Sequence, residues 1–195
     1  MTIFPVLLQR NQMDCGPTSL YMVSKCHGRN FNIEKLRELT EIGREGVSIL
    51  GISDAAEKIG YRSQAVQLSI AELMEAQLPC ILHWGQNHFV VLYQVSSLNF
   101  LRRKGLQNTL FYIADPGKRL LKYQQKDFEQ KWISSNQSSS QSSQSILPKS
   151  EGAGIALLFE PTPSFYNNIY NDDYTDERRK NFSNIIKYLY PYKSL

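Results

Sequence analysis

The chain has 195 residues, of which 42% are hydrophobic and 21% charged, a composition typical of a globular protein rather than a disordered one. This length can bury one ordinary core, so we expect one compact domain with appendages. The formal net charge is +4, and the short basic groups lack the interleaved aromatic residues of a nucleic-acid-binding surface, so we expect no nucleic-acid partner.

The three cysteines, Cys15, Cys26 and Cys80, have neither the number nor the spacing of a disulfide framework or a zinc site. The sequence also contains no phosphate-binding loop and no dinucleotide fingerprint, so we expect no cofactor and no metal. The N-terminus lacks the basic start of a signal peptide, and no apolar run approaches the ~20 residues that span a bilayer. These features predict a soluble chain in a reducing compartment.

The first third of the chain predicts helices. Pro17 suits the first turn of a helix, and Gly28 suits the left-handed residue that ends one. In chain order we expect an apolar segment compatible with a strand at 6–8, followed by helices at about 15–27, 33–40 and 48–59.

Strand patterns dominate after residue 60. Ser69 and Glu72 match a capping box that opens a short helix. We expect strands at 62–68, 80–84, 89–95, 110–114, 120–123 and 155–161, and a further helix at 126–133. Helices first and strands later predict an α+β domain with an antiparallel sheet.

Composition also sets the expected domain limits. Residues 134–145 are almost wholly Ser, Gln and Asn, which predicts a mobile loop over 134–152 before the last strand. The folded domain is expected to span residues 1–163. Residues 164–195 are expected to form a polar linker and an amphipathic helix, which suits a membrane surface, a partner, or packing on its own domain.

Cys15 is the candidate nucleophile. The thiolate is the reactive form of a cysteine, and the N-terminus of a helix favours it through unpaired amides and a partial positive charge. Cys15 stands at the predicted start of the first helix, among turn-forming residues. Cys26 and Cys80, by contrast, fit the usual pattern of buried structural cysteines.

A base must reach the sulfur, and the sequence offers three histidines. His27 lies twelve residues along the same helix, roughly 18 Å away at ~1.5 Å per residue, and is excluded. His88 begins a predicted strand after a turn, where it can face a cleft. His83 lies inside an apolar run and is more typical of a hydrogen-bonded core residue, so we favour His88 as the base.

Asp115 is the candidate third member of a catalytic triad. If the strand at 110–114 returns antiparallel to the strand at 89–95, it brings Asp115 back beside His88. The carboxylate would then accept the far imidazole N–H and stabilise the imidazolium. Asp115-Pro116 is also a common way to begin a turn, and both roles are compatible.

Acyl transfer also requires hydrogen-bond donors for the oxyanion. Gln9 lies six residues before Cys15, and its side-chain amide would form a two-donor hole with the backbone N–H of Cys15. Gln12 is the competing donor, and chain order alone does not separate the two glutamines.

Several short blocks of the sequence belong together. They are Gln9, Asp14-Cys15-Gly16, Met22, Gly28, Ile33, His88-Phe89-Val90-Val91-Leu92-Tyr93 and Ala114-Asp115-Pro116. In this order the blocks resemble the bacteriocin-processing cysteine peptidase domain of peptidase-containing ABC transporters. The resemblance covers about residues 1–163.

This resemblance implies a papain-like fold in which Cys15, His88 and Asp115 form the triad and Gln9, rather than Gln12, is the oxyanion donor. Members of the family cut a leader peptide from a secreted peptide precursor, typically after a Gly-Gly pair, before export. Thr18 stands where alanine is common in the family, and a narrow cleft admits glycines because larger side chains would clash.

The resemblance also gives the tail a meaning. It implies that residues 164–195 lead toward a transmembrane domain, so that the chain is the N-terminal part of a longer transporter with transmembrane and ATP-binding domains. Its place would then be the cytoplasmic face of the bacterial inner membrane. Two alternatives are a catalytically silent cargo-docking domain, which would lack the nucleophile, and a papain-like amidase or acyltransferase.

Overall fold

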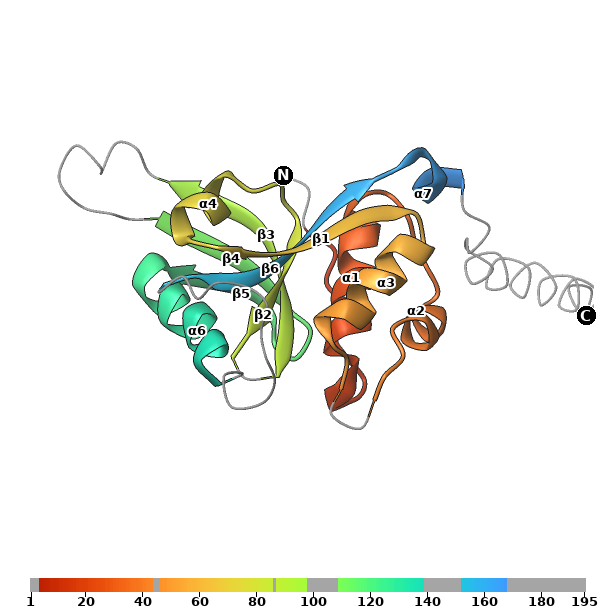
Figure 1. The fold of residues 1–195 in the computed structure, drawn as a ribbon, viewed down its shortest axis with the longest axis horizontal. Helices are drawn as coiled ribbons and strands as arrows, with labels where there is room; N and C mark the ends of the chain where they lie inside the picture. Colours follow the sequence, from red (N-terminus) through yellow and green to blue (C-terminus); the bar gives the residue numbers. More distant parts are fainter. Residues whose placement is uncertain (1–3, 44–45, 86, 98–108, 139–151, 168–195) are drawn as a thin grey trace, which may run out of the picture.

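The strands that the structure describes form one six-stranded antiparallel sheet in the order β1-β6-β2-β3-β4-β5, and helices pack on both of its faces (Figure 1). The computed structural model describes residues 4–43, 46–85, 87–97, 109–138 and 152–167. In chain order the elements are η1 (Gln12–Asp14), α1 (Cys15–Cys26), α2 (Ile33–Leu39), α3 (Ile49–Lys58), β1 (Tyr61–Leu68), α4 (Ile70–Glu75), β2 (Cys80–Trp84), β3 (His88–Ser97), β4 (Thr109–Asp115), β5 (Arg119–Gln124), α6 (Gln125–Ser138), β6 (Gly154–Pro161) and α7 (Pro163–Asn167).

The predicted α+β architecture is confirmed. The helices expected before residue 60 and the strands expected after it are present, with ends within two residues of those predicted. The segment at 6–8 is not a strand and has no regular secondary structure. Helix α6 continues to Ser138, five residues into the segment expected to be a loop, and residues 139–151 lie outside the described part of the chain.

Each face of the sheet has its own core. On one face the helices α1, α2 and α3 bury apolar residues against strands β2, β3 and β6, and Leu20 and Ile52 are fully buried there. On the other face α6 covers the sheet, where the rings of Phe111 and Phe128 stack with centroids 4.1 Å apart. Figure 1 shows these two helical layers on opposite sides of the molecule.

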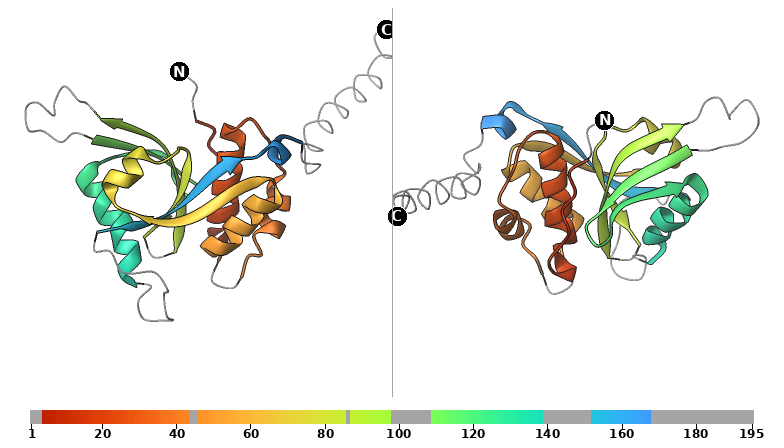
Figure 2. Two further views of the ribbon diagram at one scale, coloured as in Figure 1. Left: turned by 45° about the horizontal axis from the view of Figure 1, so that its top comes forward. Right: turned by 180° about the vertical axis from the view of Figure 1, so that it is seen from behind.

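Strands β1 and β6 connect the two halves. They pair over their whole length, from Tyr61 opposite Pro161 to Leu68 opposite Gly154. One end of this ribbon runs beside α3 and leads to α7, while Ile81 and Leu82 of β2 pair with the middle of β6 (Figure 2). The β1–β6 ribbon therefore joins the helices of the first third of the chain to the strands of the middle third.

Local signals in the sequence account for the helix ends. The Ser48 hydroxyl accepts a hydrogen bond from Gly51 N at 3.0 Å and caps α3. Gly60 follows α3 with φ at +101°, a left-handed conformation that glycine adopts without strain. Ser69 and Glu72 form the predicted capping box of α4.

The ordered fold extends past the expected domain limit at residue 163, because α7 packs on the helical half. Phe165 is fully buried, and its ring centroid lies 4.2 Å from that of Tyr61 and 5.8 Å from that of Phe31. Arg29 donates a hydrogen bond to the backbone carbonyl of Tyr166. The linker and helix expected for the remaining tail lie at 168–195, outside the described residues.

We expect Phe165→Ala to lower the free energy of unfolding by about 3–5 kcal/mol, because the substitution empties an aromatic site that is closed on all sides. Urea unfolding followed by circular dichroism measures the change. Tyr166→Ala is the matched control, since Tyr166 is 51% exposed and the carbonyl that Arg29 binds is kept. Equal stability of Phe165→Ala and the wild type would mean that α7 does not contribute to the core.

Candidate functional site

Cys15 is the first residue of α1 and is 4% exposed. The following residue, Gly16, is tightly packed: an added Cβ would lie 3.0 Å from Ile52 Cδ1 and 3.1 Å from Val47 Cβ, so these side chains would have to give way by a few tenths of an ångström. The absence of a side chain therefore lets the start of α1 lie close against α3 and the segment before it. This contact fixes the cysteine in place.

Helix α1 also packs directly on β3. The Ser19 hydroxyl donates a buried hydrogen bond to the backbone carbonyl of Phe89 at 3.3 Å. Because Ser19 lies one turn along α1 and Phe89 is the second residue of β3, the start of the helix lies beside the start of the strand. His88 occupies that first strand position.

His88 and Asp115 form a direct contact, with His88 Nε2 2.8 Å from Asp115 Oδ1. The pairing of β3 with β4, in which Val91 faces Ala114, brings the first residue of one strand close to the last residue of the other. Gly117 N donates to the same carboxylate oxygen at 2.8 Å. The carboxylate is thereby held from two sides and aligned on the imidazole.

The electrostatics of this pair are set by burial and by charge. Burial lowers the pKa of His88, but the hydrogen bonds to Asp115 and Cys15 and their negative charges outweigh it and raise the pKa to about 9. Burial raises the pKa of Asp115, but the hydrogen bonds from His88 and Gly117 outweigh it and lower the pKa below its ordinary value. The imidazole is therefore protonated at neutral pH, between a carboxylate and a sulfur.

The two glutamines considered as oxyanion donors lie differently. Gln9 is tied to the turn after β4, because its backbone N–H donates to the carbonyl of Pro116 at 2.9 Å. The side-chain amide of Gln9 reaches the carbonyl of Gln12 at 3.5 Å, a distance at the weak limit for a hydrogen bond. Gln12 is exposed and lines the pocket beside Cys15.

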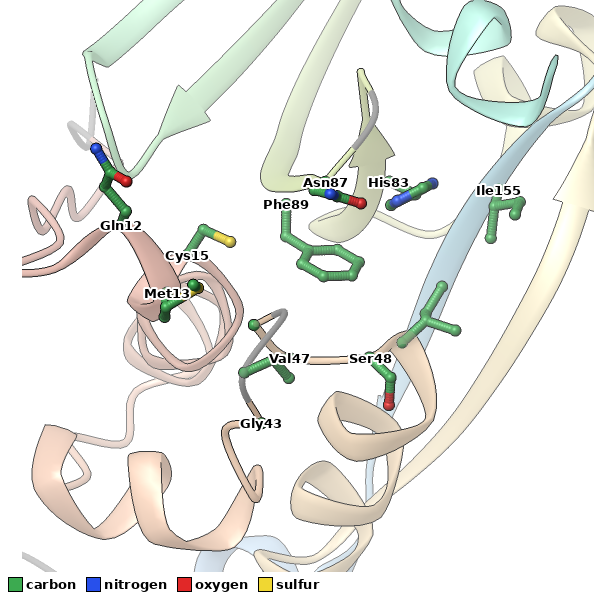
Figure 3. A pocket seen from close by; sticks show the side chains of 12 residues that line it. Gln12, Met13, Cys15, Gly43, Val47, Ser48, His83, Asn87, Phe89 and Ile155 are labelled. Atoms are coloured by element: carbon green, nitrogen blue, oxygen red, sulfur yellow. The ribbon is translucent and has the colours of Figure 1, made fainter. Parts of the chain in front are cut away.

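A pocket of about 810 Å³ opens at Cys15. Figure 3 shows the Cys15 sulfur pointing toward Phe89, with His83 and Asn87 farther along that wall and Val47 and Ser48 across from it. The lining residues are Gln12, Met13, Cys15, Gly43, Gly46, Val47, Ser48, Ile49, His83, Asn87, Phe89 and Ile155. Most of this surface is apolar, and the Cys15 sulfur lies at one end of it.

The other two histidines occupy different places. His83 is half-buried and lines the pocket, with its ring centroid 5.4 Å from that of Phe89, so the interpretation of His83 as a core residue is wrong. His27 follows the far end of α1, where Nδ1 lies 2.8 Å from the hydroxyl of Tyr61. Neither is in the contact that joins His88 and Asp115.

Two features of the site were not foreseen from the sequence. The first is Gly117, whose amide orients Asp115 and whose added Cβ would lie 3.3 Å from the carboxylate oxygen. The Asp-Pro-Gly order after β4 is a turn signal that could have pointed to it. The second is the opposite wall of the pocket, formed by residues around Val47, which no local pattern marks as functional.

A family model, described as the Peptidase C39 family, matches residues 3–136. The chain belongs to this family. C39 members are cysteine peptidases of bacteriocin-processing transporters, so the enzyme class predicted from the sequence is confirmed, as is the resemblance on which it rested.

The relatives that this chain matches are much longer proteins. The transport/processing ATP-binding protein ComA of Streptococcus pneumoniae is 31% identical over 161 residues, which are 80% of this chain and 19% of ComA. The probable microcin-H47 secretion/processing ATP-binding protein MchF of Escherichia coli is 36% identical over 91 residues, 47% of this chain and 13% of MchF. The chain thus spans less than a fifth of the length of these relatives.

A solved C39-type structure is similar over most of the chain. It is a double glycine motif protease from an AMS/PCAT transporter, crystallised with the leader peptide, with a TM-score of 0.62 and 26% identity. The match covers 81% of this chain and 91% of that one. The papain-like fold expected from the sequence is confirmed.

No helix among the described residues has the length and apolarity to cross a membrane. No group of three or more His, Cys, Asp or Glu side chains among them is arranged to hold a metal ion.

The pKa of His88 predicts how the site affects stability. Because the folded pKa of about 9 lies above the ordinary 6.5, the contribution of His88 to the free energy of unfolding is complete below pH 6.5 and is lost as the pH rises through 9. We expect Asp115→Asn to lower the His88 pKa and to flatten this decline. NMR titration of the imidazole and urea unfolding at pH 6.5 and 9 measure both. An unchanged His88 pKa in Asp115→Asn would contradict the assigned cause.

Proposed function

We propose that this C39 domain is a cysteine endopeptidase that removes the leader from a secreted peptide precursor after a Gly-Gly pair. The observation that carries the proposal is the position of His88, which lies 2.8 Å from Asp115 at the start of β3, beside the start of α1 that carries Cys15. The solved double glycine motif protease with its bound leader peptide supports the choice of substrate.

In the proposed mechanism Cys15 is the nucleophile, His88 the proton carrier and Asp115 the residue that orients His88. The imidazolium stabilises the neighbouring thiolate, which attacks the scissile carbonyl. His88 then gives its proton to the leaving amine, and the leader remains bound to Cys15 as a thioester. Water attacks the thioester while His88 takes up its proton, which releases the leader as a carboxylic acid and restores the thiolate–imidazolium pair.

The oxyanion of the tetrahedral intermediate needs two donors. We assign them to the backbone N–H of Cys15, at the start of α1, and to the side-chain amide of Gln9. The hydrogen bond from the backbone N–H of Gln9 to the carbonyl of Pro116 supports this assignment. It holds Gln9 between the segment that leads to Cys15 and the turn that follows Asp115. The weak contact of the amide with Gln12 O is one that a stronger acceptor would replace.

The pocket supports a leader peptide as the ligand. Its apolar lining, which includes Met13, Val47 and Phe89, suits the apolar side chains of an amphipathic segment.

The relatives support a wider setting for the domain. We propose that it acts within an ABC transporter, joined to transmembrane and ATP-binding domains, on the cytoplasmic face of the bacterial inner membrane. The relatives named for both transport or secretion and processing support this arrangement. In it, residues 1–163 with α7 form the peptidase, and cleavage precedes export of the mature peptide.

We expect the protein to cleave a Gly-Gly precursor once, directly after the second glycine, and Cys15→Ala to abolish cleavage. His88→Ala should also remove turnover, and Asp115→Asn should cause a smaller loss, since the imidazole remains in place without its carboxylate. Mass spectrometry of the incubated precursor identifies the products. A precursor with Ala-Ala in place of Gly-Gly is the substrate control.

Other outcomes point to other functions. Binding without cleavage by both the wild type and Cys15→Ala would favour a cargo-docking domain. Cys15-dependent hydrolysis of small amides or esters but of no Gly-Gly precursor would favour a papain-like amidase or acyltransferase. Cleavage that persists in Cys15→Ala would refute the nucleophile assignment.

We expect Gln9→Ala to lower kcat by about 100- to 1,000-fold with little change in KM, the usual cost of losing one oxyanion donor. Gln12→Ala is the matched control, and we expect it to stay within about threefold of the wild type. Steady-state kinetics on the same precursor measure both. A larger loss for Gln12→Ala would transfer the donor role to Gln12.

A further inference from the structure

Asp14 immediately precedes the nucleophile, and its side chain is 4% exposed. It occupies the N-cap position of α1, yet its carboxylate makes no cap hydrogen bond to that helix. An aspartate at this position ordinarily accepts a hydrogen bond from the N–H of the second or third helical residue. Because the third residue, Pro17, has no N–H, Gly16 is the donor available to Asp14. Here a buried carboxylate next to Cys15 is turned away from the amides that it would normally satisfy.

Two contacts account for this orientation. Asn11 N donates to Asp14 Oδ2 at 3.1 Å, within the turn before α1. Arg37 of α2 forms an ion pair with the other oxygen, with Nε 3.0 Å from Asp14 Oδ1. At 3.0 Å these two atoms are in ionic contact without hydrogen-bond geometry, and within the described part of the chain neither atom has a hydrogen-bond partner, so the ion pair is the main contact of both.

Arg37 is itself held in place. Its Nη1 lies 2.9 Å from Glu34 Oε2, one turn earlier on α2, and Glu34 Oε1 lies 3.3 Å from Arg10 Nη1. The guanidinium therefore joins α2 to the loop before the cysteine. Glu34 and Arg10 are half-exposed or more, whereas the Asp14 carboxylate is buried. An unbalanced charge at Asp14 would thus cost far more than one at Glu34.

We infer that Arg37 is a positioning residue of the cysteine site, which draws the Asp14 carboxylate away from the first turn of α1 and balances its charge. The inference rests on the proposed function. Without Arg37, the carboxylate would turn to the N–H of Gly16 at the helix start, next to the N–H of Cys15 that the substrate oxyanion uses. Its negative charge would also oppose the thiolate and the oxyanion.

Arg37→Met tests this role, because it keeps the length of the side chain and removes the cation. We expect kcat to fall about tenfold and KM to stay within about twofold, since the loss acts on the reacting atoms. Adding Asp14→Asn to Arg37→Met should return kcat to within about threefold of the wild type, because no charge is left to balance. Glu34→Gln, which breaks the outer ion pairs only, is the matched control and should leave kcat unchanged.

The rate at which iodoacetamide alkylates Cys15, followed by peptide mass spectrometry, is a second measurement that needs no peptide substrate. The Cys15 alkylation rate should fall in Arg37→Met and recover in the double variant. Wild-type kcat and alkylation in Arg37→Met, or equal impairment of the folded single and double variants, would overturn the inference. If Arg37→Met does not fold, Arg37→Lys decides: retained kcat supports the role of the cation, and a tenfold loss refutes it.

The two hypotheses fail in different ways. A wild-type protein that cleaves no Gly-Gly precursor counts against the proposed substrate, and the alkylation rates still decide the role of Arg37. A wild-type protein that cleaves the precursor, with Arg37→Met equally active, keeps the proposed function and removes only the inference about Arg37.

Discussion

The packing of α1 on β3 is the contact on which the rest of the site depends. Cys15 and His88 are 73 residues apart in the chain, and each is the first residue of its element. The buried hydrogen bond from Ser19 to Phe89 O, set in an apolar contact, aligns the two starts. A shift of one helical turn would move the sulfur by about 5.4 Å and separate it from the imidazole.

The remaining contacts refine this alignment and come from three directions. The β3–β4 pairing supplies Asp115, the Pro116 carbonyl holds the segment that leads to the cysteine, and Arg37 of α2 pairs with Asp14. The sheet thus positions the Asp115 side chain, the turn holds the backbone N–H of Gln9, and α2 holds the Asp14 side chain. Because these supports belong to both halves of the fold, the site forms only when helices and sheet are packed together.

Sequence patterns predicted the parts of this arrangement that are local. Turn residues marked the start of α1, and β-branched and aromatic residues marked β3 and β4. The end of one strand next to the start of the other placed Asp115 beside His88. No sequence pattern predicted the contact of Arg37 with Asp14, because it joins residues of separate helices that have no fixed spacing in the chain. His83 was misplaced for a related reason: an apolar neighbourhood in the chain does not reveal that one side of a strand borders a pocket.

Helix α7 was missed because a single turn of helix has too few residues to show a period, and its one buried residue, Phe165, lies in a polar segment. Its docking place has a geometric consequence. Phe165 rests against Tyr61 and His27, beyond the C-terminal end of α1, whereas the pocket opens at the N-terminal end. The twelve residues of α1 separate these points by roughly 18 Å. A bulky neighbour attached after Asn167 would therefore begin its path well clear of the pocket mouth and leave it open to an arriving peptide.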